Sequence, residues 1–303
     1  MKFDIKARSL FKISFDTVVA LGSYKELLDN TSLLKQLLYK IRENDPKLQS
    51  IYMDSIPSES ILGRYLSDSD ELRRHSIVYF PDGVRPRYFI DLPAEYGKYV
   101  SKFSAKRRYN FKRNIKKLKQ HGNGFLDLIR LQTKEDVLIY LNDITYISKR
   151  SWQQEVLGDR IKNNETYRKR FIDLAEAGLL RSYLLKCNRQ PCAFVIGYQY
   201  NDVFHYIEIA YDPIFTKYSP GTVLLCLLID DLIKYRPAKR VSFGIGDHKY
   251  KAMFSTGKYY DVSVLIIKKT FKNKILILIH QIFLKSRHIL RSTVHFMQKM
   301  LND

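Results

Sequence analysis

The sequence predicts an α+β fold in which a mixed, mainly antiparallel sheet is flanked by helices. Three apolar segments, at 180–187, 192–200 and 203–210, follow one another with only short polar turns between them, which is typical of an antiparallel meander. Apolar residues recur at helical spacing on both sides of this meander, at 137–150, 165–177 and 219–236. Together, these observations favour a sheet covered by helices.

The length and charge of the chain limit the classes of protein to which it can belong. It has 303 residues, 45% hydrophobic and 27% charged, which suits two domain-sized parts and a tail. Its 52 Lys and Arg residues against 31 Asp and Glu residues give a net charge of +21. This excess favours an anionic partner such as nucleic acid, acidic lipid or a phosphorylated small molecule, without selecting among them. An ordinary solvated surface is the alternative.

The cysteines and the N-terminus suggest a reducing, cytoplasmic setting. Cys187, Cys192 and Cys226 are too few, and odd in number, for a disulfide framework, and no nearby histidine cluster predicts a metal site. The charged start of the chain lacks the apolar core of a signal peptide. No apolar run approaches the ~20 residues that span a bilayer.

The remaining elements are predicted from the same patterns. We expect helices at 24–42 and 59–66, a short segment of unassigned type at 250–254, and strands at 50–53, 75–80, 87–92, 240–243 and 262–267. The meander is preceded by a region, 126–180, that is predicted to be mostly helical. We expect a basic amphipathic helix or helix pair at 270–303, which either contacts an anionic membrane surface or packs on the protein.

A densely basic helix is predicted at 104–119. Ser104 is a suitable N-cap, and Phe111, Ile115 and Leu118 form one helical stripe. Almost every other position is basic, including Arg107 and Arg108. This face either binds phosphate groups or is a charged, solvated surface.

A loop-to-helix junction at 217–222 could bind an anion. Ser219 is predicted to be the N-cap and Pro220 the first residue of the helix. The helix N-terminus offers free N–H groups to a pyrophosphate, while Gly221 allows close approach and Lys217 adds a positive charge. An ordinary capped helix that binds nothing is the alternative.

Two segments carry groups capable of proton transfer. Asp247, His248, Tyr250 and Lys251 crowd the end of a strand after two glycines. In the strand 203–211, simple alternation puts Tyr206 and Glu208 on one face and His205 and Tyr211 on the other. If Glu208 is buried, its pKa rises toward the range of a general base; a carboxylate on the surface is the alternative.

These segments resemble one family when they are taken in order. The matching pieces are the basic helix from Ser104, the Ser151-Trp152 step, the hairpin 181–197, Tyr211–Pro213 with Tyr218–Gly221, and Phe243–Lys251. Together they resemble the GNAT-type acetyltransferases found near cellulose and exopolysaccharide synthesis genes, the CelD/BcsL-like group. Ser242 and Ile245 depart from the acidic residue and the arginine that this family commonly has there. The family is similar to Fem-type aminoacyl transferases, which carry two GNAT-like halves.

The resemblance implies a GNAT-like fold with a degenerate N-terminal half at 1–120, an acyltransferase domain at 121–269 and the tail at 270–303. It implies transfer of an acyl group from acetyl-CoA or another acyl-CoA to an amine or hydroxyl of a sugar, polysaccharide or cell-envelope precursor, without a metal. The location implied is cytoplasmic, with possible peripheral contact at the inner face of the cell membrane.

The resemblance also implies roles for individual residues. Glu208 or Asp247 would accept the proton of the acceptor, and Tyr250 would protonate the leaving thiolate. The residues expected to seat acyl-CoA are Lys217, Ser219, Gly221 and Thr222. Those expected to contact the acceptor are Arg107, Arg108, Trp152, His205 and Lys251.

Two other functions stay open at this point. A Fem-like transferase that uses aminoacyl-tRNA would employ the net charge and the 104–119 helix to bind RNA. A non-catalytic accessory protein of polysaccharide synthesis is also compatible with the sequence, and the departures at Ser242 and Ile245 favour it.

Overall fold

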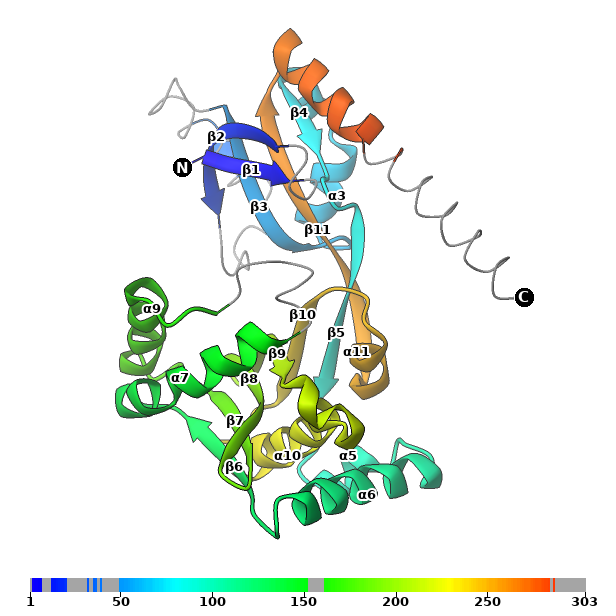
Figure 1. Ribbon diagram of the computed structural model, residues 1–303. Coiled ribbons are helices and arrows are strands. Elements are labelled where there is room, and N and C mark those ends of the chain that lie inside the picture. Colours follow the sequence, from blue (N-terminus) through cyan, green and yellow to red (C-terminus); the bar gives the residue numbers. More distant parts are fainter. Residues whose placement is uncertain are drawn as a thin grey trace, which may run out of the picture. The chain divides into compact units, whose positions relative to one another are not determined.

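The computed structural model describes residues 2–6, 12–20, 32, 35–36, 39, 49–151, 161–283 and 286 (Figure 1). The chain divides into two compact units. One consists of Met1–Pro86 with Tyr259–Asp303, and the other of Arg87–Lys258. Within the described residues the fold is α+β with a mainly antiparallel sheet flanked by helices, as predicted. The boundaries at 120 and 269 concern GNAT-like halves, and they stay a prediction.

The first unit is built around the antiparallel pair of β3 (Ser50–Pro57) and β11 (Gly257–Lys268). Its other strands are β1 (Lys2–Lys6), β2 (Lys12–Ala20) and β4 (Ser76–Tyr79), and it contains the helices α3 (Ile61–Asp68) and α4 (Asp70–His75). The α3 helix begins where the Ser60 side chain accepts a hydrogen bond from the Gly63 amide. Its apolar side covers β3 and β11.

The second unit contains a sheet in the order β5-β10-β9-β8-β7-β6. Its strands are β5 (Val84–Asp91), β6 (Leu126–Leu131), β7 (Ser182–Cys187), β8 (Gln190–Tyr200), β9 (Val203–Tyr211) and β10 (Arg240–Ile245). Neighbouring strands are antiparallel, apart from β9 and β10, which run parallel. The predicted meander is confirmed as β7-β8-β9.

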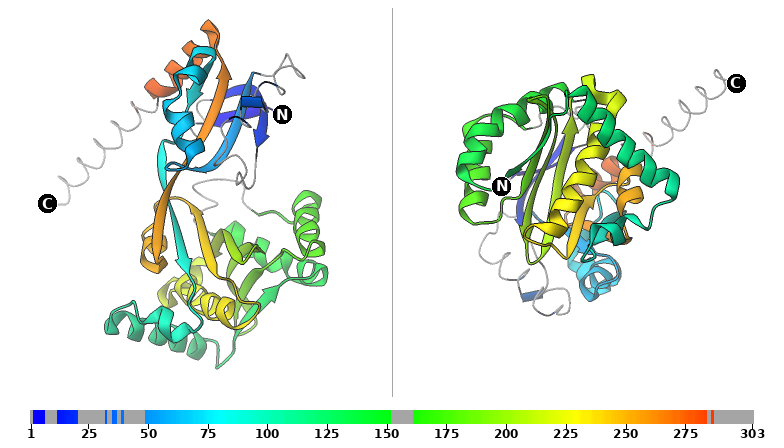
Figure 2. Two further views of the ribbon diagram at one scale, coloured as in Figure 1. Left: turned by 180° about the vertical axis from the view of Figure 1, so that it is seen from behind. Right: turned by 90° about the horizontal axis from the view of Figure 1, so that it is seen from below.

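Helices cover both faces of this second sheet. They are α5 (Tyr96–Val100), α6 (Ala105–His121), α7 (Lys134–Arg150), α9 (Glu165–Glu176), the 3-10 helix η2 (Pro213–Tyr218), α10 (Pro220–Lys234) and α11 (Lys249–Phe254). In the right-hand view of Figure 2, α7 and α9 lie on one side of the strands and α10 and α6 on the other. Two separate apolar cores result. We refer to the two sides of the sheet as the α9 face and the α10 face.

Most predicted elements of the second unit are confirmed. Ser104 caps α6 by accepting from the Arg107 amide, while Phe111 and Leu118 are buried. The stretch 126–180, predicted to be mostly helical, contains α7 and α9 as expected, but it begins with a strand, β6, that was not predicted. In β6, odd and even positions both carry apolar side chains, and these pack into different cores, so the strand shows no simple alternation.

Other predictions fall partly outside the described residues. In the predicted 24–42 helix, residues 32, 35, 36 and 39 are described, and they are helical. The tail is helical over 271–283. There Ile277 and His280 are buried, and the His280 ring contacts the Tyr79 hydroxyl at 2.5 Å. The apolar residues that stay exposed on this helix are Phe271, Ile275, Leu278, Ile279 and Ile282.

Candidate active site

The parallel strands β9 and β10 separate soon after they begin to pair. Their register covers Arg240–Ser242 against Val203–His205 and stops there. Beyond this point β10 continues along β5 with a register shift between Ser242 and Ile245, where Gly244 takes a φ of 65°. That conformation is easy for glycine and strained for other residues. The second half of β9 is therefore left without β10 as a neighbour.

A β-bulge interrupts β9 beside this separation. Ile196 of β8 pairs with Glu208, while the next residue, Gly197, pairs with Tyr206, so Ile207 is an extra residue in β9. A bulge shifts all later side chains to the opposite face. At the centre of the sheet, the bulge residue Ile207 thus lies outside the β8–β9 register, and the residues of β9 that follow it pair with β8 but not with β10.

Because of the bulge, side chains of β9 lie on different faces of the sheet from those predicted. Tyr206 packs in the core of the α10 face, whereas Glu208 pairs with Ile196, which belongs to the core of the α9 face. His205 stacks on Tyr198 at a ring distance of 4.6 Å, and Tyr211 packs on the α10 face. The expectation that Tyr206 and Glu208 share a face is therefore wrong. Strict alternation fails because of the extra residue, Ile207.

Two tyrosine hydroxyls meet on the α10 face. The Tyr250 hydroxyl of α11 lies 3.0 Å from that of Tyr206. Burial is the main cause that raises the pKa of both phenols, so both stay protonated at neutral pH. Nearby, Asp247 is exposed and accepts a hydrogen bond from the buried Tyr88 hydroxyl at 2.7 Å. The arrangement provides a protonated phenol in Tyr250 and an oriented carboxylate in Asp247.

Lys251 is a buried cation beside the turn at Gly246. Its exposed fraction is 6%, and its Nζ lies near Gly246, whose φ is 118°. The pKa of Lys251 is lowered to about 8, mainly because the residue is buried and secondly because of the positive charge of Arg87. The same two causes, burial before Arg87, lower the pKa of His205. Arg87 thus adds positive charge to the region in which Lys251 and His205 lie.

We expect Lys251→Met to remove a pH-dependent part of the stability. An unfolded lysine titrates at 10.5, whereas folded Lys251 titrates at about 8. The cost of burying the charge is complete below pH ~8 and is relieved as the pH rises toward ~10.5. The unfolding free energy of the wild type should therefore gain roughly 1–2 kcal/mol relative to the variant between about pH 7 and about pH 9.5. Urea unfolding at the two pH values measures this gain. Lys249 is an exposed lysine of the same helix, and the prediction would be contradicted if Lys249→Met showed the same pH-dependent difference from the wild type.

The junction between η2 and α10 differs from a simple cap. Ser219 precedes the helix as predicted, but it takes the left-handed conformation, with φ 55° and ψ 52°, and its side chain makes no capping hydrogen bond. The predicted positions of Ser219 as N-cap residue and Pro220 as first helical residue are confirmed, but the expected side-chain hydrogen bond of the cap is absent. Pro220 has no N–H, and the amides of Gly221 and Thr222 lie in the first turn, where a helix offers no acceptor. Lys217 is exposed at the end of η2.

Gly221 faces the half of β9 that lies beyond the bulge. A Cβ atom at this position would meet the Ile209 and Tyr211 side chains at 3.7 and 3.6 Å, which is ordinary contact. Alanine would therefore fit at this position, so the glycine is not required by packing against these two side chains. The first turn of α10 lies close to the backbone that β10 leaves uncovered.

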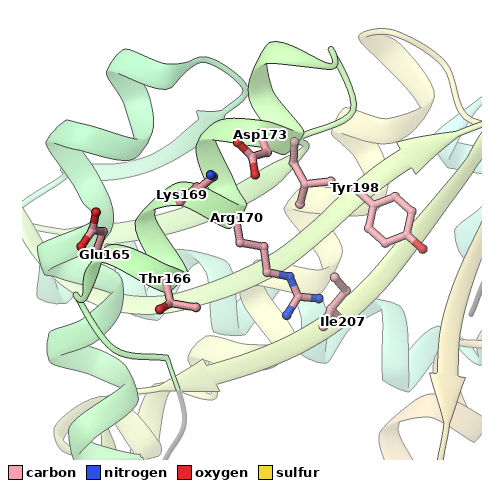
Figure 3. Close-up of a pocket in the computed structure, with 8 residues that line it drawn as sticks. Glu165, Thr166, Lys169, Arg170, Asp173, Tyr198 and Ile207 are labelled. Atoms are coloured by element: carbon pink, nitrogen blue, oxygen red, sulfur yellow. The ribbon is translucent and has the colours of Figure 1, made fainter. Parts of the chain in front are cut away.

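The α9 face carries a pocket of about 570 Å³ that sequence reasoning missed (Figure 3). Its lining residues are Glu165, Thr166, Lys169, Arg170, Asp173, Leu174, Tyr198 and Ile207. The pocket reaches the bulge through Ile207 and the predicted residue His205 through the stacked Tyr198. In the sequence, the polar residues of α9 that line the pocket look like those of any exposed helix face. Only the pairing of His205 with Tyr198 across the meander could have suggested where the pocket lies.

The predicted acceptor-binding residues do not form one group. Arg107 is exposed on α6, and Arg108 donates to the carbonyls of Phe103 and Ser101 at 2.5 and 3.4 Å. Since α6 packs against α10 and η2, both arginines belong to the α10 face, whereas His205 belongs to the α9 face. Trp152 lies outside the described residues.

The described part of the chain contains neither a metal-binding cluster nor a membrane-spanning helix. There, no group of three or more His, Cys, Asp and Glu side chains is arranged to hold a metal ion. Across the same residues, no helix combines the length and apolar character needed to cross a membrane. The cysteines Cys187, Cys192 and Cys226 are buried and free.

The comparison with protein families defines the class of this region. Residues 105–252 match the family described as Acetyltransferase (GNAT) domain. The separated parallel strands, the bulged β9 and the helix that follows it all lie within that range. The match agrees with the observed architecture, and the fold of this region is GNAT-like.

Solved structures extend the likeness over most of the chain. A structure of FemX aligns with a TM-score of 0.60 at 11% identity, covering 92% of this chain and 86% of that one. The C-terminal domain of a putative lysylphosphatidylglycerol synthetase from Agrobacterium fabrum aligns at 0.57, with 10% identity and coverage of 88% and 84%. L-PGS from Bacillus licheniformis aligns at 0.52, with 12% identity and coverage of 89% and 85%. At these identities the likeness shows the fold alone. No curated protein matches the sequence.

Proposed function

We propose that this protein is a CoA-dependent acyltransferase that binds acyl-CoA where β9 and β10 separate. The observation that carries the proposal is the end of their pairing at His205 and Ser242, directly beside the bulge of β9. At this separation the extended, amide-rich pantetheine arm would lie along the side of β9 that does not pair with β10. The GNAT domain match over 105–252 supports the same ligand.

The first turn of α10 fits the pyrophosphate of CoA. The Gly221 and Thr222 amides have no acceptor within the helix, and Ser219 does not cap them with its side chain. The helix dipole and the exposed Lys217 add positive potential. The lack of a side-chain cap is useful here, because a capping oxygen would occupy the site of the phosphate.

The two faces of the sheet would supply different steps of the reaction. Tyr250 on the α10 face would protonate the CoA thiolate, and its raised pKa keeps the proton available. Glu208 lies at the bulge on the α9 face and would accept the proton of the amine or hydroxyl; Asp247 is the alternative base. Backbone N–H groups at the bulge would polarise the thioester carbonyl. As a cation, Lys251 would steady negative charge on the acceptor.

We infer that the acceptor is a sugar, polysaccharide or cell-envelope precursor, as in the CelD/BcsL-like group, with residues 1–120 as a degenerate GNAT-like half. Contact of 270–303 with the anionic inner leaflet is a further part of the proposal. The exposed apolar residues Ile275, Ile279 and Ile282 support it. Sedimentation with anionic liposomes, with and without residues 270–303, tests the membrane contact: equal sedimentation would contradict it.

Thr222→Glu tests the seat of the pyrophosphate. A carboxylate in the first turn favours the helix itself but repels the diphosphate. We expect the Kd for acetyl-CoA, measured by calorimetry, to rise roughly 30-fold, about 2 kcal/mol, whereas the neutral Thr222→Gln stays within about 3-fold of the wild type. Equal effects of the two variants, or no acetyl-CoA binding by the wild type, would contradict the proposal.

A Fem-like transferase that uses aminoacyl-tRNA is the second candidate, and α6 favours it. The helix contains no acidic residue, and its exposed basic residues are Lys106, Arg107, Lys112, Arg113, Lys116, Lys117 and Lys119. Among the described residues, none of them forms an ion pair. This alternative predicts tRNA binding that weakens steeply with salt, and no binding of CoA, so the same calorimetry with tRNA separates the two functions.

A further inference from the structure

The pocket on the α9 face is where an acyl acceptor would reach the bulge of β9. It is lined by Ile207, the extra residue of the bulge, and by Tyr198, which stacks on His205. Tyr250 and α10, by contrast, belong to the opposite face. If acyl-CoA occupies the separation of β9 and β10, a second substrate in this pocket meets the acyl group from the other side of the sheet.

Arg170 supplies the charge nearest to the bulge. Figure 3 shows its side chain extending from α9 toward Ile207, with Tyr198 beside it, while Glu165 lies at the far end of the helix segment. Within the described part of the chain, the exposed Arg170 guanidinium forms no ion pair with an acidic side chain. The pocket thus presents a guanidinium that forms no ion pair at the end that adjoins the candidate reaction centre, although Glu165 and Asp173 balance the formal charge of its lining.

A second guanidinium acts on the same end of the pocket. Burial raises the pKa of Tyr198, and the charges of Arg87 and Arg170 both oppose that rise. The charge of Arg87 also helps to lower the pKa of the neighbouring His205. Close to Tyr198, these two guanidinium groups disfavour a positively charged group of an acceptor, whereas the lining carboxylates Glu165 and Asp173 belong to the same pocket. An acceptor with an anionic group would be attracted, and a guanidinium binds phosphate or carboxylate with two parallel hydrogen bonds.

We propose that the acyl acceptor is an anionic molecule whose phosphate or carboxylate group is bound by Arg170 next to Tyr198. This contact would hold the accepting amine or hydroxyl against the bulge at Ile207. In the transfer, the carbon–sulfur bond of the thioester breaks and a carbon–nitrogen or carbon–oxygen bond forms. The proton of the acceptor passes to the base, the Tyr250 proton goes to the thiolate, and the products are the acylated acceptor and CoA. The inference rests on the proposed acyltransferase function.

Matched probes that differ only in the anion test this inference. Glucosamine 6-phosphate is compared with glucosamine, and lysine with 1,5-diaminopentane, by calorimetric titration of the full chain. We expect at least one anionic probe to bind, and to bind at least ~10-fold more tightly than its partner. A preference confined to the first pair identifies a phosphate as the anion, and one confined to the second identifies a carboxylate.

Arg170→Gln should abolish this preference. Arg168→Gln is the matched control, since it removes the same charge from the same helix outside the pocket, where Arg168 donates to Asn163. Failure of both anionic probes to bind the wild type, equal affinity within both pairs, or an unchanged preference in Arg170→Gln would overturn the inference. Acetyl-CoA is titrated in parallel: its binding should be unaffected by Arg170→Gln, so failure of the acceptor inference and failure of the proposed function give different results.

Discussion

Tyr250→Phe is expected to lower kcat roughly 100-fold while leaving the Kd for acetyl-CoA within about 2-fold. General acid catalysis by a positioned side chain is worth ~10²–10⁴ in rate, and the phenol of Tyr250 is the protonated group that meets Tyr206 on the α10 face. Burial raises its pKa, so the hydroxyl keeps its proton through the neutral range until the thiolate forms. Steady-state kinetics with acetyl-CoA and calorimetry separate the two quantities.

Tyr206→Phe is the matched control for this experiment. It removes the other partner of the same 3.0 Å contact, so the two variants lose the same hydrogen bond. Tyr206 is almost completely buried, and burial is the main cause that holds its pKa well above the usual value, so it is less suited to donate a proton to a ligand. If the two variants lost kcat equally, the effect would come from the lost hydrogen bond, and Tyr250 would not be the acid.

Asp231→Ala should be the most destabilising single change considered. Arg181 is fully buried, and its guanidinium is surrounded by Asp231, Gln199 and the Tyr183 hydroxyl. Tyr183 also donates to Asp231 at 2.9 Å. Removing the carboxylate leaves a buried cation without its counter-charge, which costs about 3–5 kcal/mol. Urea unfolding of the full chain measures the loss.

Asp230→Ala is the matched control, because Asp230 is the neighbouring carboxylate on α10 and pairs with the exposed Lys234 at 2.8 Å. We expect only a small change there, since solvent screens exposed pairs. Asp231→Asn keeps the shape but removes the charge, and should be intermediate, which keeps the test valid if Asp231→Ala does not fold. Equal stability of the Asp230 and Asp231 variants would show that the buried network contributes little to the fold.

Local sequence patterns were sufficient for much of the second unit. The Ser104 cap and the stripe of Phe111 and Leu118 define α6, and the short turns between apolar segments define the meander β7-β8-β9. These features depend on neighbours within a few residues along the chain, so a single sequence displays them. By contrast, β6 was missed because side chains on both of its faces are apolar, which hides the period of a strand.

The candidate site was only partly accessible to the same reasoning. The junction at 217–222 and the cluster around Tyr250 are contiguous in sequence, so a single sequence could suggest them as candidates. The pocket was not found, because Arg170 and Ile207 come from segments that the fold brings together across two other strands. The expected side-chain cap of Ser219 also failed. One residue joins η2 directly to α10, and this connection takes the left-handed conformation that directs the serine away from the role of a cap.

The sequence by itself therefore determined the helices and strands around the site, the basic face of α6 and the order of the motifs. Only the tertiary structure decided which face of the sheet each group occupies. The physical reason is the register of β9 against β8, which shifts at Gly197; there the Phe204 ring packs so closely that a Cβ atom on Gly197 would lie 2.4 Å from it. Next to that contact, the register accommodates Ile207 as an extra residue and places Glu208 on the face opposite Tyr206. Alternation along β9 cannot reveal such a shift, because the extra residue is defined only by the strand that lies opposite.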